Sequence, residues 1–165
     1  MSAAPIQSPL GPQSGHGRAR RGPAYHLLNR ATWGFTTADL AELSQRGYSG
    51  WLSWQLEPGL IDDSVCDSML AQYPTLTLTA YEIAQGYFGT GGGPLGTHWG
   101  MAQELRNARL TRAVHSKRQL FERVVEFWTD HFNVAQDLGS WARAFRTVAD
   151  REVFRQHALG NFRDL

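Results

Sequence analysis

Residues 117–134 read KRQLFERVVEFWTDHFNV, and this stretch decides the fold class because its apolar residues recur at helical spacing. At about 100° per residue, one arc of the helix collects most of the large apolar side chains and the opposite arc collects the charged ones. The expected buried arc holds Leu120, Phe121, Val124, Val125, Trp128 and Phe132, with Phe127 at its edge. The run therefore predicts an amphipathic helix that packs against a core.

His131 falls between Leu120 and Val124 on this wheel, so the pattern predicts a buried imidazole bonded to a neighbouring segment. An unpaired buried polar group costs about 1–3 kcal/mol, so the ring needs a partner. Two interpretations stay open. His131 is either a core histidine bonded to a backbone carbonyl or a catalytic or ligand-binding group.

Glu122, Glu126 and Asp130 follow each other at four-residue spacing and share the polar arc. Helical bundles that hold metals combine such carboxylates with a histidine three residues after a glutamate, and that pairing is missing here. A solvated face is therefore the interpretation we adopt, and no metal site is predicted. Gly91, Gly93 and Gly96 formally match a dinucleotide-binding pattern, but no strand precedes them, so no cofactor is predicted either.

Helical signals recur from residue 23 onward, and sustained strand alternation is nearly absent. Pro23 opens one helix, Thr36 with Asp39 forms a capping box, and Ser116 with Gln119 is expected to cap the helix described above. Asp150 is expected to cap the last helix. The fold class predicted is all-α, a compact array of short helices joined by short loops, with a glycine-rich loop at residues 89–96.

Composition bounds the function. The net charge of +1 disfavours a nucleic-acid surface, and no apolar run is long enough to span a membrane.

Residues 1–22 hold seven glycines and prolines and three arginines, and are expected to form a disordered basic tail before the domain at residues 23–165. No secretory signal follows this tail, so the chain as written is expected in the cytoplasm. The single Cys66 excludes an intrachain disulfide.

On the first expected helix, His26 and Arg30 are four residues apart, and Asn29 and Trp33 share their side. A guanidinium beside an imidazole and an amide suits a carboxylate or a phosphate. The alternative is an exposed face on which Arg30 pairs with an acid elsewhere.

Three segments together resemble one family: Tyr25–Gly34, Gln119–Val134 and Ala158–Leu165. They are similar to the bacterial domain of unknown function (DUF) 1800 family across roughly residues 23–165. The resemblance implies an uncharacterised protein, and the family's recurring positions map onto Asn29, Arg30, Gly34, Phe127, Trp128, His131, Phe132, Gly160, Asn161 and Phe162.

Family members are usually longer and carry a further motif that is absent here, so the resemblance implies that residues 23–165 are the N-terminal portion of a truncated domain. Many members are exported, which is the alternative localisation. Such a portion is expected to leave apolar surface uncovered, with Val153, Phe154 and Ala158 named as examples.

Two functional hypotheses follow. The first is a helical scaffold or interaction module that acts with a protein partner or with the missing C-terminal part of its domain. The alternative is the N-terminal half of a hydrolase-like or anionic-ligand-binding enzyme, in which Arg30 holds an anion and His131 acts as acid or base. His26, Asn29 and Asn161 are further ligand-binding candidates.

Overall fold

The computed structural model describes residues 22–88, 98–133, 135 and 139–165. The expected basic tail, apart from Gly22, and the glycine-rich loop lie outside the described residues. The described residues form helices and turns and contain no strand, which confirms the all-α prediction. The α-helices are α1 (Pro23–Ala31), α2 (Thr37–Gln55), α3 (Ser64–Leu70), α4 (Ala80–Phe88), α5 (His98–His115), α6 (Gln119–His131), α7 (Ser140–Ala149) and α8 (Arg155–His157).

Shorter helical turns join them. The 3₁₀ segments are η1 (Pro58–Leu60), η2 (Pro74–Thr77) and η5 (Phe162–Asp164), and a π-helical segment, η4 (Asp150–Phe154), lies between α7 and α8. Among the described helices, none is both long and apolar enough to cross a membrane.

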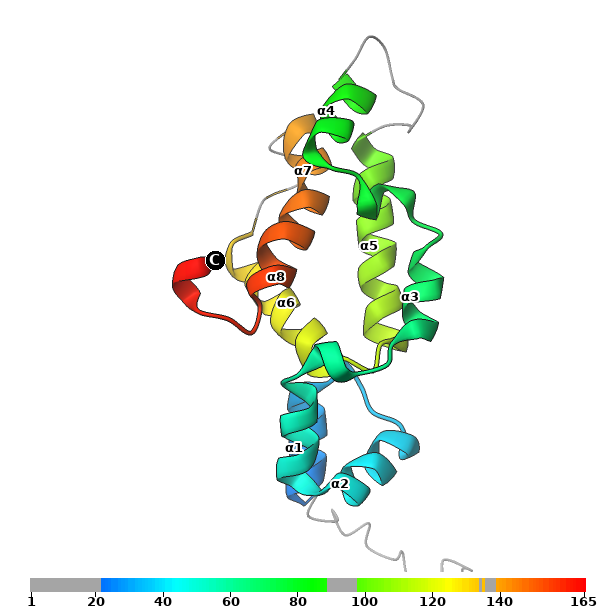
Figure 1. Ribbon diagram of the computed structural model, residues 1–165, viewed down its shortest axis with the longest axis vertical. Helices are drawn as coiled ribbons and strands as arrows, with labels where there is room; N and C mark the ends of the chain where they lie inside the picture. Colours follow the sequence, from blue (N-terminus) through cyan, green and yellow to red (C-terminus); the bar gives the residue numbers. More distant parts are fainter. Residues whose placement is uncertain (1–21, 89–97, 134, 136–138) are drawn as a thin grey trace, which may run out of the picture.

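The N-terminal helices α1 and α2 pack together at one end of the molecule (Figure 1). The predicted capping box is present, since Thr36 accepts from the Asp39 amide and Asp39 accepts from the Thr36 amide. Gly47 then kinks α2 with φ of 72°, a value that side chains other than glycine rarely adopt. Leu28, Ala31, Leu43 and Trp51 form the apolar cluster between these helices.

Helix α5 runs along the middle of the molecule, with α3 beside it and α4 and α7 packed toward its N-terminal end (Figure 1). Ile83 of α4, Met101 of α5 and Ala144 of α7 form a second apolar cluster and have no exposed surface. A third cluster joins α6 to the C-terminal segment through Val125, Phe154 and Ala158. The expectation that Phe154 and Ala158 lack cover is therefore wrong, because they are 8% and 5% exposed.

The buried face of α6 agrees only in part with the arc that the sequence predicts. Leu120, Phe121, Val124, Val125 and Trp128 pack into the apolar clusters as predicted. Glu122, Val125 and Thr129 are its buried residues, whereas Phe127 is 57% exposed and His131 is exposed. The prediction of a buried His131 is thus wrong. Trp128 does bond to a neighbouring segment, since its indole N–H donates to the Ala158 carbonyl at 3.0 Å.

Candidate functional site

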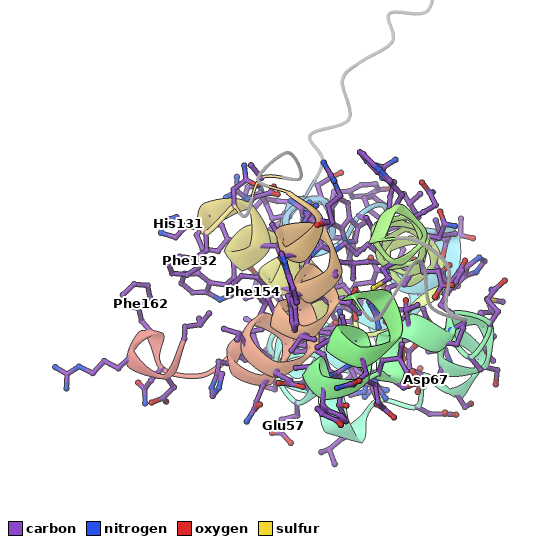
Figure 2. All side chains as sticks on the ribbon, turned by 90° about the horizontal axis from the view of Figure 1, so that it is seen from above. Glu57, Asp67, His131, Phe132, Phe154 and Phe162 are labelled. Atoms are coloured by element: carbon purple, nitrogen blue, oxygen red, sulfur yellow. The ribbon has the colours of Figure 1, made fainter. Side chains whose placement is uncertain are left out.

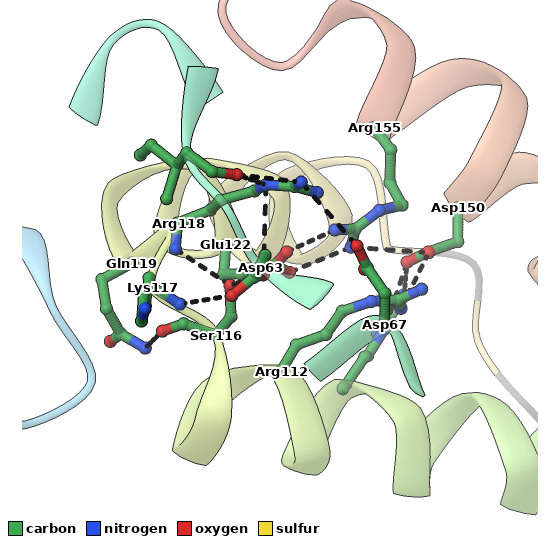
Figure 3. A network of polar contacts seen from close by, with 12 residues as sticks. Asp63, Asp67, Arg112, Ser116, Lys117, Arg118, Gln119, Glu122, Asp150 and Arg155 are labelled. Atoms are coloured by element: carbon green, nitrogen blue, oxygen red, sulfur yellow. Dashed lines mark hydrogen bonds and ion pairs between the residues drawn. The ribbon is translucent and has the colours of Figure 1, made fainter. Parts of the chain in front are cut away.

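A polar network lies among α3, α5, α6 and the C-terminal helices (Figure 3). Asp63 stands at the turn between α5 and α6, where it accepts from the Ser116 hydroxyl at 2.6 Å and from the Lys117 amide at 2.7 Å. Gln55 bridges the same turn to the end of α2 by donating to the Lys117 carbonyl and accepting from the Leu120 amide. These contacts fix the angle at which α6 leaves α5.

The start of α6 has the expected residues in a different arrangement. The Ser116 hydroxyl accepts from the Arg118 amide, and the Gln119 side chain donates to the Ser116 carbonyl and accepts from the Trp33 amide. The predicted capping box is therefore replaced by contacts that join the end of α1 to the start of α6.

Asp150 is the centre of the second part of the network. It is 2% exposed, and one carboxylate oxygen accepts from Nη2 of Arg109 at 3.0 Å. Its other oxygen lies 3.9 Å from Arg112 and 4.0 Å from Arg155. Arg155 also makes a two-pronged ion pair with buried Glu122, with 3.0 Å between Nη1 and Oε2. The expectation that Asp150 caps the last helix is wrong, because α7 continues into η4 and the carboxylate faces three arginines instead.

The arginines of α5 line two different cavities. Arg106, Arg109 and Arg112 follow at three-residue spacing, so each is rotated about 60° from the one before. Arg106 and Arg109 line a cavity of about 310 Å³ between α5, α6 and α7, which we call the α5–α7 pocket. Arg112 lines a second cavity, of about 420 Å³, together with Asp150, Arg151 and Arg155.

The α5–α7 pocket combines an apolar lining with positive charge. Ala102, Leu105, Leu110, Ala113 and Trp33 supply the apolar surface, and Arg106, Arg109, Arg146 and Glu126 supply the charges. Arg109 is held by Asp150 and by a 3.4 Å contact to the Thr129 hydroxyl. The side chains of Arg106 and Arg146 make no hydrogen bond or ion pair to another described residue. Burial, reinforced by the charge of Arg109, lowers the pKa of Arg146.

Among the described residues that line this pocket, Glu126 is the single carboxylate. Burial raises its pKa, and the negative charges of Asp130 and Asp150 act in the same direction, while Arg109 opposes them. The ionised carboxylate is therefore less stable in the folded chain than in water.

We expect Glu126→Gln to raise the free energy of unfolding at neutral pH. Since the folded pKa is raised, the cost of ionised Glu126 is present above that pKa and disappears as pH falls toward the ordinary value of 4.5. Urea denaturation of both proteins at neutral and acid pH measures the difference, with Glu152→Gln, at an exposed carboxylate, as the control. A variant that is less stable than wild type at neutral pH would contradict the proposed environment of Glu126.

The second cavity has a more balanced charge. Arg112 has a buried Nη1 without a hydrogen bond, and burial lowers its pKa, as does the neighbouring charge of Arg155. The buried Thr147 hydroxyl also lacks a partner among the described residues. Asp67 and Asp150 line the same space, so the three arginines there do not produce a clear excess of positive charge.

The candidate residues on α1 are exposed and lie outside these two cavities. His26, Asn29 and Arg30 are on the solvent side of the helix, and the Asn29 side chain donates to the Tyr25 carbonyl at 2.7 Å. His131 is at the opposite end of α6 from the Gln119 contact to Trp33, roughly 18 Å along the helix axis. The structure therefore keeps Arg30 and His131 apart.

His131 instead belongs to an exposed aromatic cluster near the C-terminus. Its ring stacks on Phe127 with centroids 5.9 Å apart and meets Phe132 edge-on at 4.9 Å. Phe162, next to the exposed Asn161, packs against Trp128 and Phe132. Figure 2 shows His131, Phe132, Phe154 and Phe162 on one side of the molecule. Two of the segments that resemble the family thus meet here, while the α1 segment does not join them.

The three carboxylates of α6 lie in three different environments. Glu122 pairs with Arg155, Glu126 faces the α5–α7 pocket, and Asp130 is exposed. Within the described ranges, no group of three or more histidines, cysteines and carboxylates could hold a metal ion.

Cys66 is buried, and burial together with the charge of Asp63 raises the pKa of its thiol to about 11. This thiol is unsuited to act as a nucleophile at neutral pH.

Sequence reasoning missed the arginines of α5, Arg146 and the roles of Asp63 and Asp150. A signal was available for part of this set, since Arg106, Arg109 and Arg112 recur at three-residue spacing on one expected helix. Arg109 and Arg112 pair with Asp150, which lies on another helical segment far along the chain, 41 residues from Arg109, so no local pattern connects them.

The comparisons with known proteins place the chain in a family without assigning it an activity. The family model described as a protein of unknown function, DUF1800, matches residues 26–165. No curated protein and no solved structure matches the chain. The chain therefore belongs to the DUF1800 family of uncharacterised proteins, as its three motifs indicate, and it is a helical member of that family.

Proposed function

We propose that this chain is an α-helical binding module that takes a small organic anion in the α5–α7 pocket. The observation that carries the proposal is the meeting of Arg106, Arg109 and Arg146 in one pocket with an apolar lining, where Glu126 is the single carboxylate among the described lining residues. Ligand sites in proteins are typically concave and largely apolar, with a few polar groups that fix orientation.

Arg146 is the residue best suited to receive the anion. It projects from α7 and is half-buried, and it has no acidic partner at ion-pair distance among the described residues. Because burial lowers its pKa, a bound anion would relieve an unfavourable environment for its charge. Arg109 is already oriented by Asp150 and so presents a fixed guanidinium to the same space.

Binding without catalysis is the interpretation that the geometry favours. The hydrolase-like alternative relied on Arg30 as anion holder and His131 as acid or base. Arg30 lies on α1, whose C-terminal end meets the start of α6, whereas His131 lies at the other end of α6. Neither lines the α5–α7 pocket. We therefore assign anion binding to the arginines of α5 and α7 instead of Arg30.

Calorimetric titration of the full chain tests the proposal with hexanoate, hexanesulfonate and the neutral hexanamide. Both anions should bind and the amide should not. Arg146→Gln should weaken anion binding about tenfold or more, since a hydrogen bond to a charged group contributes about 1.5–3 kcal/mol. Arg163→Gln, at an exposed arginine of η5 outside the pocket, is the matched control.

Two results would defeat this proposal: equal affinity for amide and carboxylate, or equal losses in the Arg146 and Arg163 variants. A thermal melt of each variant separates a binding defect from misfolding. Arg146→Gln should fold, because the wild-type side chain forms no ion pair that the substitution would break.

A further inference from the structure

The α5–α7 pocket extends from its charged groups toward one end of α5. Leu110, Ala113 and Trp33 lie on that side, beyond Arg109 in the direction of the helix C-terminus. Trp33 is placed there by its amide, which donates to the Gln119 side chain at 3.0 Å, and Gln119 in turn donates to the Ala113 carbonyl at 3.2 Å. The pocket therefore has a charged part and an apolar part.

The apolar side chains of this pocket are open to solvent. Leu110 is 61% exposed and Trp33 is 42% exposed, although both line the pocket. The Arg123 guanidinium covers the Trp33 ring at 4.6 Å from its centroid and holds the indole at the end of the pocket. A ligand that covered Leu110 and the accessible part of the indole would remove apolar surface from water, which favours binding.

The apolar part of the pocket follows one helix. From Arg109 to Ala113 the lining of α5 rises roughly 6 Å toward the helix C-terminus, and Trp33 lines the same pocket. From these observations we infer that the ligand is a medium-chain acyl carboxylate, with its carboxylate at Arg109 and Arg146 and its tail along Leu110 and Ala113 toward Trp33. This inference rests on the proposed anion site and specifies the chemical class that the site accepts.

The tail predicts a dependence on chain length. Each methylene that leaves water contributes a roughly constant increment, which corresponds to about a fourfold gain in affinity per methylene. Affinity should therefore rise from butanoate through hexanoate to octanoate. It should stop rising once the tail reaches Trp33, so decanoate and dodecanoate should bind no more tightly than octanoate.

Calorimetry of the full chain with this series, below the concentrations at which the longer acids form micelles, is the experiment. Leu110→Gln should flatten the increase with chain length and leave butanoate unchanged, because Leu110 contacts only the tail. Val114→Gln is the control, since Val114 is an exposed apolar residue of the same helix that does not line this pocket. A second arm replaces the free acids by vesicles of phosphatidylglycerol and phosphatidylcholine, which present acyl chains beneath an anionic headgroup.

The outcomes separate the two proposals. If no anion binds, the binding function and the ligand class both fail. If all acids bind equally and remain sensitive to Arg146→Gln, the anion site stands and the acyl tail is wrong. Binding to vesicles without binding of the free acids would also overturn the inference, because the ligand would then be a lipid surface.

Discussion

Replacing Asp150 by Asn is expected to lower the free energy of unfolding by about 3–5 kcal/mol, which is the usual cost of removing one partner from a buried ion pair. Asp150 is 2% exposed and stands within 4.0 Å of Arg109, Arg112 and Arg155. The amide keeps the shape of the side chain but removes its charge. Three partly buried guanidinium groups would then repel each other across the space that Asp150 occupied.

Urea denaturation of wild type and Asp150→Asn measures this loss. The matched control is Glu152→Gln in the same π-helical segment, since the Glu152 side chain is 52% exposed and its pair with Arg151 is a surface ion pair. Exposed pairs contribute about 0–1 kcal/mol, so this control should stay close to wild type. Similar losses in the two variants would show that Asp150 does not hold the arginines together.

A second substitution tests the electrostatic explanation itself. In the Asp150→Asn background, Arg112→Met removes one of the unbalanced charges and replaces it with an apolar side chain of similar length. Buried ion pairs replaced as a unit by apolar groups are often neutral or stabilising. Partial recovery of stability is therefore expected, and a further loss would point to packing as the cause.

The local signals of the sequence predicted the helices well. Pro23 begins α1, Thr36 and Asp39 cap α2, and the amphipathic run gives α6. Each of these features depends on side chains within four residues of each other, so the sequence contains the full interaction. The kink of α2 is local in the same sense, because it falls at Gly47, whose φ of 72° suits glycine.

The buried faces could not be predicted in the same way. Helix α6 packs against an apolar cluster at Val125 and against the arginines of other helices at Glu122 and Thr129. A wheel that sorts residues by hydropathy assumes a single apolar environment. It therefore places charged residues outside, although Arg155 and Arg109 make the interior favourable for Glu122 and Thr129.

The candidate site shows the same limit. Arg30 and His131 were selected because each stood in a recognisable local pattern. The pocket arginines form a candidate site only together with Glu126, Trp33 and the apolar lining of α5. These residues come from four separate parts of the chain. Only the three-dimensional structure shows that they share one space.

Helix α6 offers a direct test of the corrected buried face, in which Glu122→Ala and His131→Ala should differ strongly. Glu122 is 7% exposed and pairs through both carboxylate oxygens with Arg155. Burial opposes the charge of Arg155, but the charge of Glu122 and its hydrogen bonds raise the pKa of Arg155 overall, as does the charge of Asp150. Removing Glu122 leaves this guanidinium with Asp150 at 4.0 Å as its remaining acidic neighbour.

We therefore expect Glu122→Ala to cost about 3–5 kcal/mol and His131→Ala to stay within about 0.5–1 kcal/mol, as is usual for surface positions. His131 is exposed and makes ring contacts to Phe127, Trp128 and Phe132, so its loss removes only part of an accessible cluster. Chemical denaturation midpoints of the two variants compare these costs on one helix. A lower midpoint for His131→Ala would restore the buried arc that the sequence alone predicts, because only an imidazole with a buried partner could outweigh a lost carboxylate–guanidinium pair.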